Sequence, residues 1–198
     1  MADAKPQARV NLEKASVLLL DDSSDGMAII VQILTGFGVK KIERCSNLLQ
    51  AQDIACQWDL DLTLVNANMP EDQGYDFISW LRRAPSCEAN RFTSAMMLSG
   101  HTRLSSVKKA RDCGANFIVA KPLSPSTLMD RLLWVAREKR PFVVCDTYAG
   151  PDRRFKDKGP PEGLPGRRSV DKFRKEESDT AAPSESNEPA PQPKRDAR

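Results

Sequence analysis

Apolar runs and amphipathic segments alternate along the first two thirds of the chain. Runs such as SVLLL (16–20) and LTLV (62–65) are apolar throughout, which is typical of strands covered on both faces. Between such runs, apolar residues recur every three or four positions, which predicts amphipathic helices. We predict strands near 16–20, 39–45, 62–65, 94–99 and 116–120, and helices near 25–36, 47–56, 75–84, 103–114 and 124–140.

This alternation predicts an α/β fold with a parallel sheet and right-handed crossovers. Residues suited to begin helices stand just ahead of several amphipathic segments. Asp21 to Ser24 precede the first helix, Ser46 or Asn47 the second, and Ser124 stands before Pro125 at the last.

The composition changes near residue 140, where the apolar periodicity stops and prolines become frequent. Nine of the 14 prolines follow that point. A Pro-rich, polar segment buries too little apolar surface to offset the entropy of ordering it. We therefore predict a disordered N-terminal arm (1–14), a folded domain (15–140) and a basic, Pro-rich and mostly disordered tail (141–198).

No apolar run is long enough for a membrane span, and the polar N-terminus does not resemble a signal peptide. We therefore expect a cytoplasmic protein without a membrane partner. The five cysteines stand singly, with no C-x-x-C pair. That pattern argues against a disulfide framework or a zinc site and predicts buried or inert thiols.

Polar residues capable of chemistry follow four of the five predicted strands. Because the carboxyl ends of parallel strands share one edge of a sheet, we expect these side chains to meet there. Carboxylate and amide oxygens suit Mg²⁺, a lysine suits phosphate, and a hydroxyl can donate to a phosphate oxygen. The residues are Asp21, Asp22, Asn66, Ser99 and Lys121.

These residues lie in motifs that resemble the receiver domain of two-component response regulators. VLLLDDSS resembles the acidic pair after the first strand, and LTLVNANMPEDQGYDFI the strand and loop that carry the phosphate acceptor. MMLSGHT resembles the hydroxyl-bearing strand, and GANFIVAKPLS the Lys-Pro turn. The resemblance covers about residues 16–138, in order and with matching spacing.

The resemblance implies a bacterial signalling protein with a flavodoxin-like (βα)5 fold, a three-layer sandwich with strand order 2-1-3-4-5. It implies phosphate transfer from a histidine kinase to an aspartate, with Mg²⁺ held by Asp21 and Asp22. It also implies a cis peptide bond between Lys121 and Pro122.

Three positions depart from the family, the least consequential being Gln73, which replaces a small acidic or polar residue before Gly74. Asn66 stands where the family has its phosphate-accepting aspartate, and a neutral amide cannot attack phosphorus as a carboxylate does. The formal charge of the cluster becomes −1 instead of −2, so we expect Mg²⁺ to bind weakly or not at all. Ile118 occupies the aromatic switch position and lacks a polar tip.

The tail offers a separate candidate site. Residues 153–175 hold nine basic and three acidic side chains, including the pairs Arg153-Arg154 and Arg167-Arg168. Arginine matches phosphate geometry and stacks on bases. One interpretation is therefore that the tail binds an anionic ligand, such as a cyclic dinucleotide, a nucleic acid or an acidic protein. The alternative is a solvated segment that packs back on the domain through Phe142, Tyr148 and Phe155.

Three functional hypotheses follow. The first is a phosphorylation-independent pseudo-receiver that binds a histidine kinase or other signalling proteins through its fourth and fifth strand–helix units, around Ser106 to Lys109 and Leu123 to Leu128. The second keeps a phosphate response, through another acceptor or through Mg²⁺ and small phosphodonors. The third makes the arginine-rich tail a binder of nucleotides or nucleic acid. With no nucleophile–base pair in the sequence, we expect no enzyme activity.

Overall fold

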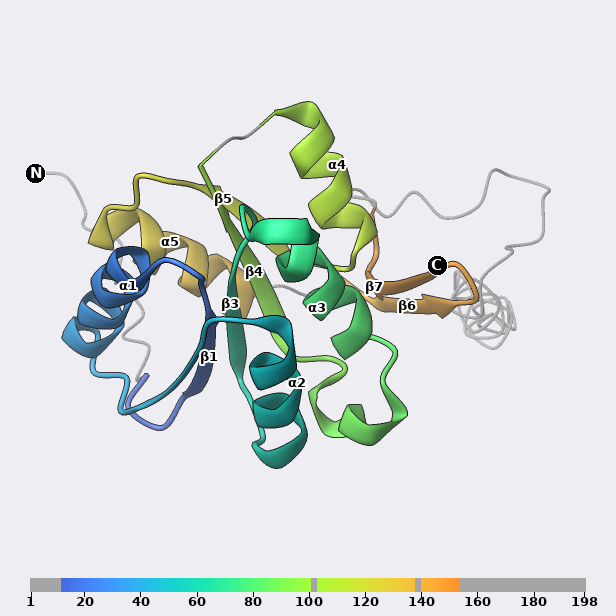
Figure 1. The fold of residues 1–198 in the computed structure, drawn as a ribbon, viewed down its shortest axis with the longest axis horizontal. Helices are drawn as coiled ribbons and strands as arrows, with labels where there is room; N and C mark the ends of the chain where they lie inside the picture. Colours follow the sequence, from blue (N-terminus) through green and yellow to red (C-terminus); the bar gives the residue numbers. More distant parts are fainter. Residues whose placement is uncertain (1–11, 101–102, 138–139, 154–198) are drawn as a thin grey trace, which may run out of the picture. The chain divides into compact units, whose positions relative to one another are not determined.

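Strands and helices alternate through the domain in the computed structural model, which describes residues 12–100, 103–137 and 140–153 (Figure 1). The five strands of the main sheet are all parallel and lie in the order β2-β1-β3-β4-β5. Their bounds are β1 Ser16–Leu20, β2 Lys41–Cys45, β3 Leu62–Asn66, β4 Ser94–Ser99 and β5 Phe117–Ala120. The predicted fold class and strand order are confirmed.

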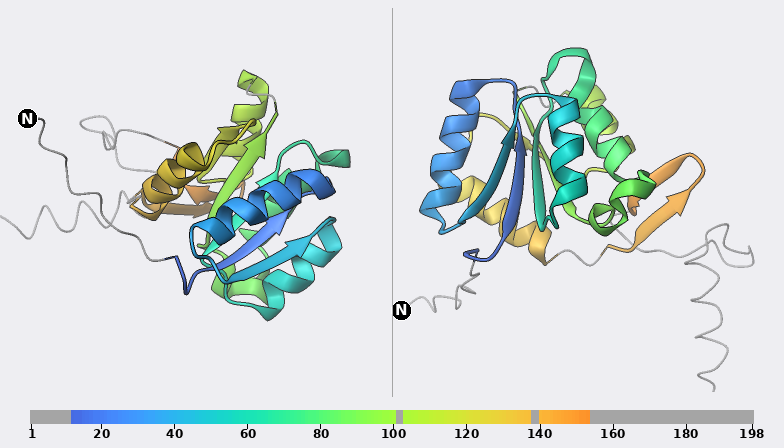
Figure 2. Two further views of the ribbon diagram at one scale, coloured as in Figure 1. Left: turned by 90° about the vertical axis from the view of Figure 1, so that its left-hand side faces the viewer. Right: turned by 60° about the horizontal axis from the view of Figure 1, so that its bottom comes forward.

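Helices cover both faces of this sheet (Figure 2). They are α1 Ser24–Gly36, α2 Leu48–Gln57, α3 Gln73–Leu81, α4 Leu104–Asp112 and α5 Pro125–Ala136, with short 3-10 turns η1 Pro70–Asp72 and η2 Pro85–Asn90. Three helices begin at predicted N-caps, because the side chains of Ser23, Asn47 and Ser124 each accept the backbone N–H three residues later. Of the helices that the structure describes, none has the length and apolar content needed to cross a membrane.

The alternation of side chains along each strand divides the core into two layers. Leu18, Leu20 and Met97 pack with α2, α3 and α4. Val17, Leu19 and Met96 point to the opposite face and pack with α1 and α5. Because β1, β3 and β4 are buried on both faces, they appear in the sequence as continuous apolar runs.

An antiparallel hairpin follows the domain, formed by β6 (Phe142–Cys145) and β7 (Tyr148–Pro151). The folded part therefore extends beyond the predicted boundary at residue 140. The hairpin escaped prediction because its strands have four residues each, and Pro141 and Pro151 at its ends made the segment read as loop. Contacts with the domain also begin before its predicted start at residue 15, because Glu13, which lies in the predicted arm, forms an ion pair with Lys40.

Two glycines let the hairpin approach the turn between α4 and β5. A Cβ on Gly150 would lie 2.6 Å from the Cα of Gly114, and a Cβ on Gly114 would lie 2.4 Å from the carbonyl oxygen of Ala149. Neither contact leaves room for a side chain. Tyr148 is buried beside them and donates its hydroxyl to the Pro151 carbonyl at 2.6 Å. The hairpin is thus docked by close backbone packing as well as by side chains.

Arg82 at the end of α3 is fully buried, with 0% of its surface exposed. Its guanidinium lies 5.3 Å from the ring centre of Phe142, so it also supports the hairpin. Burial lowers the pKa of this arginine to about 10. The guanidinium donates to the carbonyls of Gly114, Arg91 and Thr93 and to the side-chain oxygen of Asn116, at 2.7–3.0 Å.

Cys56 and Cys87 form a disulfide, which corrects the prediction that the cysteines are inert thiols. The pair joins the end of α2 to η2 across a sequence separation of 31 residues, with Cα atoms 4.9 Å apart. Such a pairing depends on how two distant segments pack, which single cysteines in a sequence do not reveal. Cys45, Cys113 and Cys145 are free thiols.

Candidate functional site

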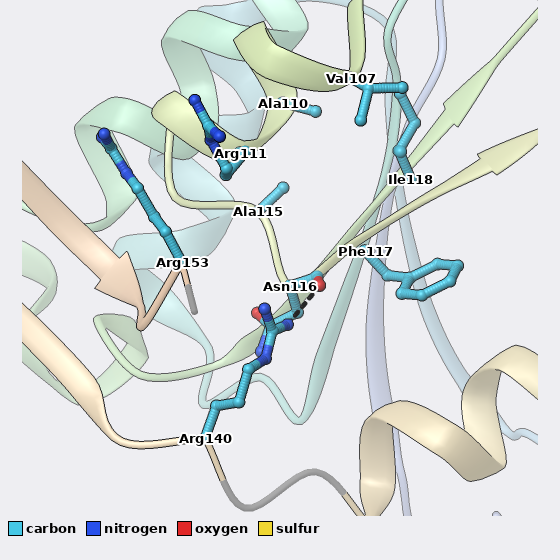
Figure 3. Close-up of a pocket in the computed structure, with 9 residues that line it drawn as sticks. All are labelled: Val107, Ala110, Arg111, Ala115, Asn116, Phe117, Ile118, Arg140 and Arg153. Atoms are coloured by element: carbon cyan, nitrogen blue, oxygen red, sulfur yellow. Dashed lines mark hydrogen bonds between the residues drawn. The ribbon is translucent and has the colours of Figure 1, made fainter. Parts of the chain in front are cut away.

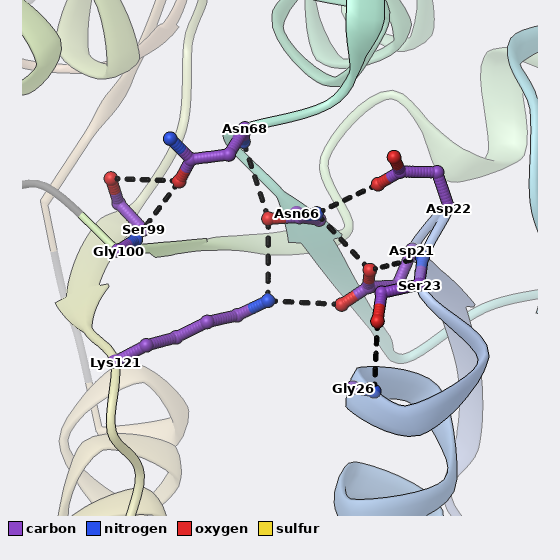
Figure 4. Close-up of polar contacts among 9 residues, drawn as sticks. All are labelled: Asp21, Asp22, Ser23, Gly26, Asn66, Asn68, Ser99, Gly100 and Lys121. Carbon is purple, nitrogen blue, oxygen red and sulfur yellow. Dashed lines mark hydrogen bonds and ion pairs between the residues drawn. The ribbon is translucent and has the colours of Figure 1, made fainter.

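The predicted site residues meet at the carboxyl edge of the sheet (Figure 4). Asp21 follows β1, Asn66 ends β3 and Ser99 ends β4, while Lys121 follows β5. The peptide bond between Lys121 and Pro122 is cis, as the family resemblance implies. Strand order therefore brings together residues that are up to 100 positions apart in the sequence.

Asn66 lies at the centre of this cluster, and its amide nitrogen is shared between two carboxylates. The nitrogen donates to Asp22 at 2.9 Å and to Asp21 at 3.1 Å. Asp21 is completely buried and Asn66 is 5% exposed, so the hydrogen bond to Asp21 is shielded from water, whereas Asp22 is exposed. Charge-assisted hydrogen bonds of this kind are stronger than neutral ones.

The amide oxygen of Asn66 faces hydrogen-bond donors, on the side away from its amide nitrogen. It accepts from Lys121 Nζ at 3.3 Å and from the backbone N–H of Asn68 at 3.2 Å. Lys121 also forms an ion pair with Asp21 at 3.0 Å. Donors on one side and acceptors on the other fix the orientation of the amide, because a flipped amide would place its oxygen against the carboxylates.

Ser99 joins the cluster through Asn68. The Ser99 hydroxyl donates to the side-chain oxygen of Asn68 at 3.4 Å, and the backbone N–H of Gly100 donates to the same oxygen at 2.9 Å. One amide oxygen thus takes two donors suited to an anion. Asn68 was not among the predicted site residues, although its place two residues after the end of β3 is the available signal.

The start of α3 is held against β3 by Gly74. A Cβ at this position would lie 2.3 Å from the backbone oxygen of Asn66 and 3.0 Å from a Val65 methyl. Only glycine allows this approach, which fixes the loop carrying Asn68 beside the cluster.

The donor set is a poor fit to Mg²⁺ in this arrangement. Asp21 and Asp22 supply suitable oxygens, but Asn66 turns N–H groups toward both carboxylates, in the space that a shared cation would need. Within the part of the chain that the structure describes, no group of three or more His, Cys, Asp or Glu side chains could hold a metal ion.

The remaining candidates lie away from this cluster. Ile118 packs partly buried beside the core on β5 and lines a cavity with Val107 of α4. Arg153 forms an ion pair with Asp112 at 3.3 Å and lies over the ring of Tyr148. Arg154, Arg167, Arg168 and Phe155 fall outside the described residues, so the tail site stays a prediction.

A model of the response regulator receiver domain family matches residues 17–133 of the chain. Among curated proteins, a probable chemotaxis protein CheY of Rhizobium etli is 28% identical over 112 residues, which cover 57% of this chain and 84% of that protein. A probable cyclic di-GMP phosphodiesterase of Vibrio cholerae is 28% identical over 130 residues, covering 66% of this chain. The chain spans 28% of the length of that phosphodiesterase.

Solved structures of receiver domains and of CheY proteins also resemble this chain. Chemotaxis protein CheY4 of Vibrio cholerae superposes with a TM-score of 0.56 at 26% identity, over 61% of this chain and 98% of that one. The receiver domain of sensor histidine kinase PA1611 of Pseudomonas aeruginosa PAO1 superposes with a TM-score of 0.55 at 21% identity, over 62% and 98% of the two chains. That structure holds a magnesium ion coordinated in its active-site cleft.

Proposed function

Because the chain belongs to the response regulator receiver domain family, we propose that it is a pseudo-receiver of two-component signalling, which acts through protein partners without being phosphorylated. The observation that carries this proposal is the amide of Asn66, whose nitrogen bridges Asp21 and Asp22. The residue at the acceptor position is thus both chemically unreactive and fully engaged within the cluster.

The Asn66 amide donates to the two carboxylates that a divalent cation would neutralise in a receiver pocket, and so offsets part of their repulsion. Its two N–H groups satisfy carboxylate oxygens that would otherwise repel each other. Mg²⁺ binding would require this amide to turn away and both hydrogen bonds to break. The proposal therefore includes weak Mg²⁺ binding, and Asp21 and Asp22 are the residues that would hold the ion.

Asn68 supports the proposal from the side where phosphate would bind. Its side-chain oxygen accepts from the Ser99 hydroxyl and the Gly100 N–H, two groups placed to hold an anion. Lys121, the third such group, is paired with Asp21. The pocket is therefore closed by its own side chains, and its conformation does not depend on a bound phosphoryl group.

Partner proteins then bind a surface whose conformation is determined by folding alone and not by phosphorylation. We place this surface on α4 and β5 and at the start of α5, including Ser106 to Lys109 and Leu123 to Leu128. A histidine kinase is one candidate partner. The match to the phosphodiesterase covers 28% of that protein, and the proposal does not extend to its activity.

Incubation with acetyl phosphate and Mg²⁺, followed by intact mass measurement, tests the proposal. We expect no added phosphoryl group on the natural chain. The Asn66→Asp variant is the matched control, because it restores a carboxylate nucleophile at the same position. A stable phosphoryl group on the natural chain would overturn the proposal. Peptide mapping of that group to Asp72 or Asp76, two acidic residues near the pocket in the sequence, would favour the hypothesis of another acceptor.

A further inference from the structure

Strand β6 leaves one of its edges unpaired. Within the part of the chain that the structure describes, its small sheet has only two strands, so β6 pairs with β7 alone. A free edge exposes a row of backbone N–H and C=O groups that can pair with another strand. At one edge of the main sheet, β2 carries Lys41, Glu43 and Arg44, charges that discourage such pairing. Strand β6, with the sequence FVVC, carries no charge.

The unpaired backbone groups of β6 belong to Phe142 and Val144. The N–H of Asp152 donates to the carbonyl of Pro141 at 2.8 Å, so these two opposed residues are hydrogen-bonded. In an antiparallel ladder, every second pair of opposed residues is bonded in this way. Val143 therefore bonds to β7, whereas the N–H and C=O groups of Phe142 and Val144 point to the free edge.

Apolar side chains lie beside these backbone groups. Val144 is 48% exposed, and it shares a face of the strand with Phe142, two residues earlier. Phe92, which follows η2, is 60% exposed and packs edge to face on Phe142, with ring centres 4.8 Å apart. A second strand at this edge would cover apolar surface as well as satisfy backbone groups.

The start of β6 is held firmly by the domain. Arg140, just ahead of the strand, donates to the backbone oxygen of Asn116 at 2.8 Å (Figure 3). Its guanidinium also lies 5.6 Å from the ring centre of Trp134. Together with the close packing of Gly150 on Gly114, these contacts order the hairpin before any partner binds. Pairing at its edge then costs less conformational entropy.

We propose that β6 pairs with β6 of a second copy of this chain, in antiparallel orientation. A twofold axis at Val143 places Phe142 opposite Val144 of the second copy, and the reverse. The outward N–H and C=O groups of both residues then bond to each other across the axis. The side chains form aromatic–β-branched pairs, which stabilise antiparallel strands. The surface lies outside the family match, which ends at residue 133, and the inference does not rest on the proposed function.

Charge selects this register among the possible ones. The same axis places Asp146 of the second copy opposite Arg140, so opposite charges stand at both ends of the pairing. A shift by two residues in one direction would set Asp146 opposite Phe142. A shift in the other direction would set Arg140 opposite Val144, and each shift separates the two charges. A second copy of the chain thus complements this edge in both apolar surface and charge.

Sedimentation velocity of the full chain over a wide range of concentration tests the pairing. We expect the dimer fraction to rise with concentration. Amide hydrogen exchange, followed by NMR, locates the contact. The amides of Phe142 and Val144 should exchange more slowly as the concentration rises, because they are bonded only in the dimer. The amide of Val143, bonded to β7, should exchange slowly at every concentration.

Variants at Val144 separate the edge from the hairpin. Val144→Pro removes the outward donor and leaves the bonds to β7 intact, so dimerisation should weaken by about tenfold or more. Val144→Thr keeps the N–H and the β-branched shape, and should keep the dimer. Melting temperatures show whether each variant is folded.

A charge reversal tests the register. Asp146→Lys should weaken the dimer by about two- to fivefold, because it sets like charges opposite each other. Asp53→Lys makes the same change at an exposed position of α2 and should leave the dimer unchanged.

Several outcomes would overturn the inference. A monomer at every concentration with a protected Val144 amide would mean that another segment of the same chain covers β6. A monomer whose Val144 amide is protected only when a peptide of alternating valine and threonine is added would assign the edge to a foreign strand. A monomer with rapid exchange under both conditions would mean that the edge stays open. A dimer that survives Val144→Pro, or that weakens equally in Asp53→Lys and Asp146→Lys, would place the contact on another surface.

Discussion

The side-chain nitrogen of Asn66 lies 2.9 Å from a carboxylate oxygen of Asp22. The same nitrogen reaches Asp21 at 3.1 Å, so a neutral donor holds two acidic groups together at the carboxyl edge of the sheet. An aspartate at this position would present oxygen to oxygen at these distances. The substitution therefore changes the balance of charge in the pocket as well as its reactivity.

Asn66→Asp should lower the stability of the chain in EDTA by about 1–3 kcal/mol, because two hydrogen bonds become contacts between like charges. Mg²⁺ should raise the melting temperature of the variant much more than that of the natural chain. Asn47→Asp is the control, since it makes the same chemical change at the N-cap of α2, where aspartate is well tolerated. Equal stability of both variants in EDTA would contradict the bridging role of the amide.

Asn68→Ala should speed phosphorylation in the Asn66→Asp background. The substitution removes the oxygen that accepts from Ser99 and Gly100, so both donors become available to a phosphoryl oxygen. The rate is measured by intact mass during incubation with acetyl phosphate and Mg²⁺. Asn68→Asp keeps an acceptor oxygen and adds negative charge, so it should not share the increase. An unchanged rate in Asn68→Ala would show that Asn68 does not compete with phosphate.

Arg82→Met should destabilise the fold by about 3–5 kcal/mol, because the buried acceptors of four hydrogen bonds lose their donor. Arg82→Lys should recover part of that loss at most, since an ammonium does not reproduce the planar fork. Denaturant unfolding measures both changes. Arg83→Met is the matched control, because Arg83 is the exposed neighbour and should tolerate the same change. A small effect at Arg82 would mean that water replaces its hydrogen bonds.

Gly150→Ala should loosen the hairpin, because the new Cβ would lie 2.5 Å from the Tyr148 hydroxyl oxygen and 2.6 Å from the Gly114 Cα. Relief of that overlap requires the hairpin to shift, at a cost of about 1–3 kcal/mol. Limited proteolysis should then cut near residue 145 sooner than in the natural chain. Gly36→Ala meets nothing within 4 Å and should be neutral or slightly stabilising. Equal cleavage of the two variants would contradict the docking role of the glycines.

The sequence predicted the main sheet well because its signal is local. Strands β1 and β4 match their predicted bounds, and the caps Ser23 and Ser124 act within three residues of themselves. The hairpin and the Cys56–Cys87 disulfide depend on contacts between distant segments. No periodicity in four-residue strands and no spacing between single cysteines encodes such contacts.

In the candidate site, the sequence predicted which residues come together but not how their side chains are hydrogen-bonded. Four residues were predicted to lie close together because each stands at the end of a predicted strand, and the carboxyl ends of parallel strands meet at one edge of the sheet. They are Asp21, Asn66, Ser99 and Lys121. The direction of each hydrogen bond was not predictable, since it depends on which way the Asn66 amide faces. The bridging nitrogen of Asn66 emerges only from the three-dimensional arrangement.

The three free cysteines should differ in their reactivity toward iodoacetamide, which attacks the thiolate. Burial raises the pKa of Cys45 to about 12 and that of Cys113 to about 11. Hydrogen bonds from Thr147, chiefly from its side chain, lower the pKa of the exposed Cys145. As pH rises from neutrality, Cys145 should therefore be labelled first, and Cys45 and Cys113 only after unfolding. Peptide mass mapping measures the labelling. Cys145→Ser should take no label in its native state, and rapid native labelling of Cys45 would contradict its burial.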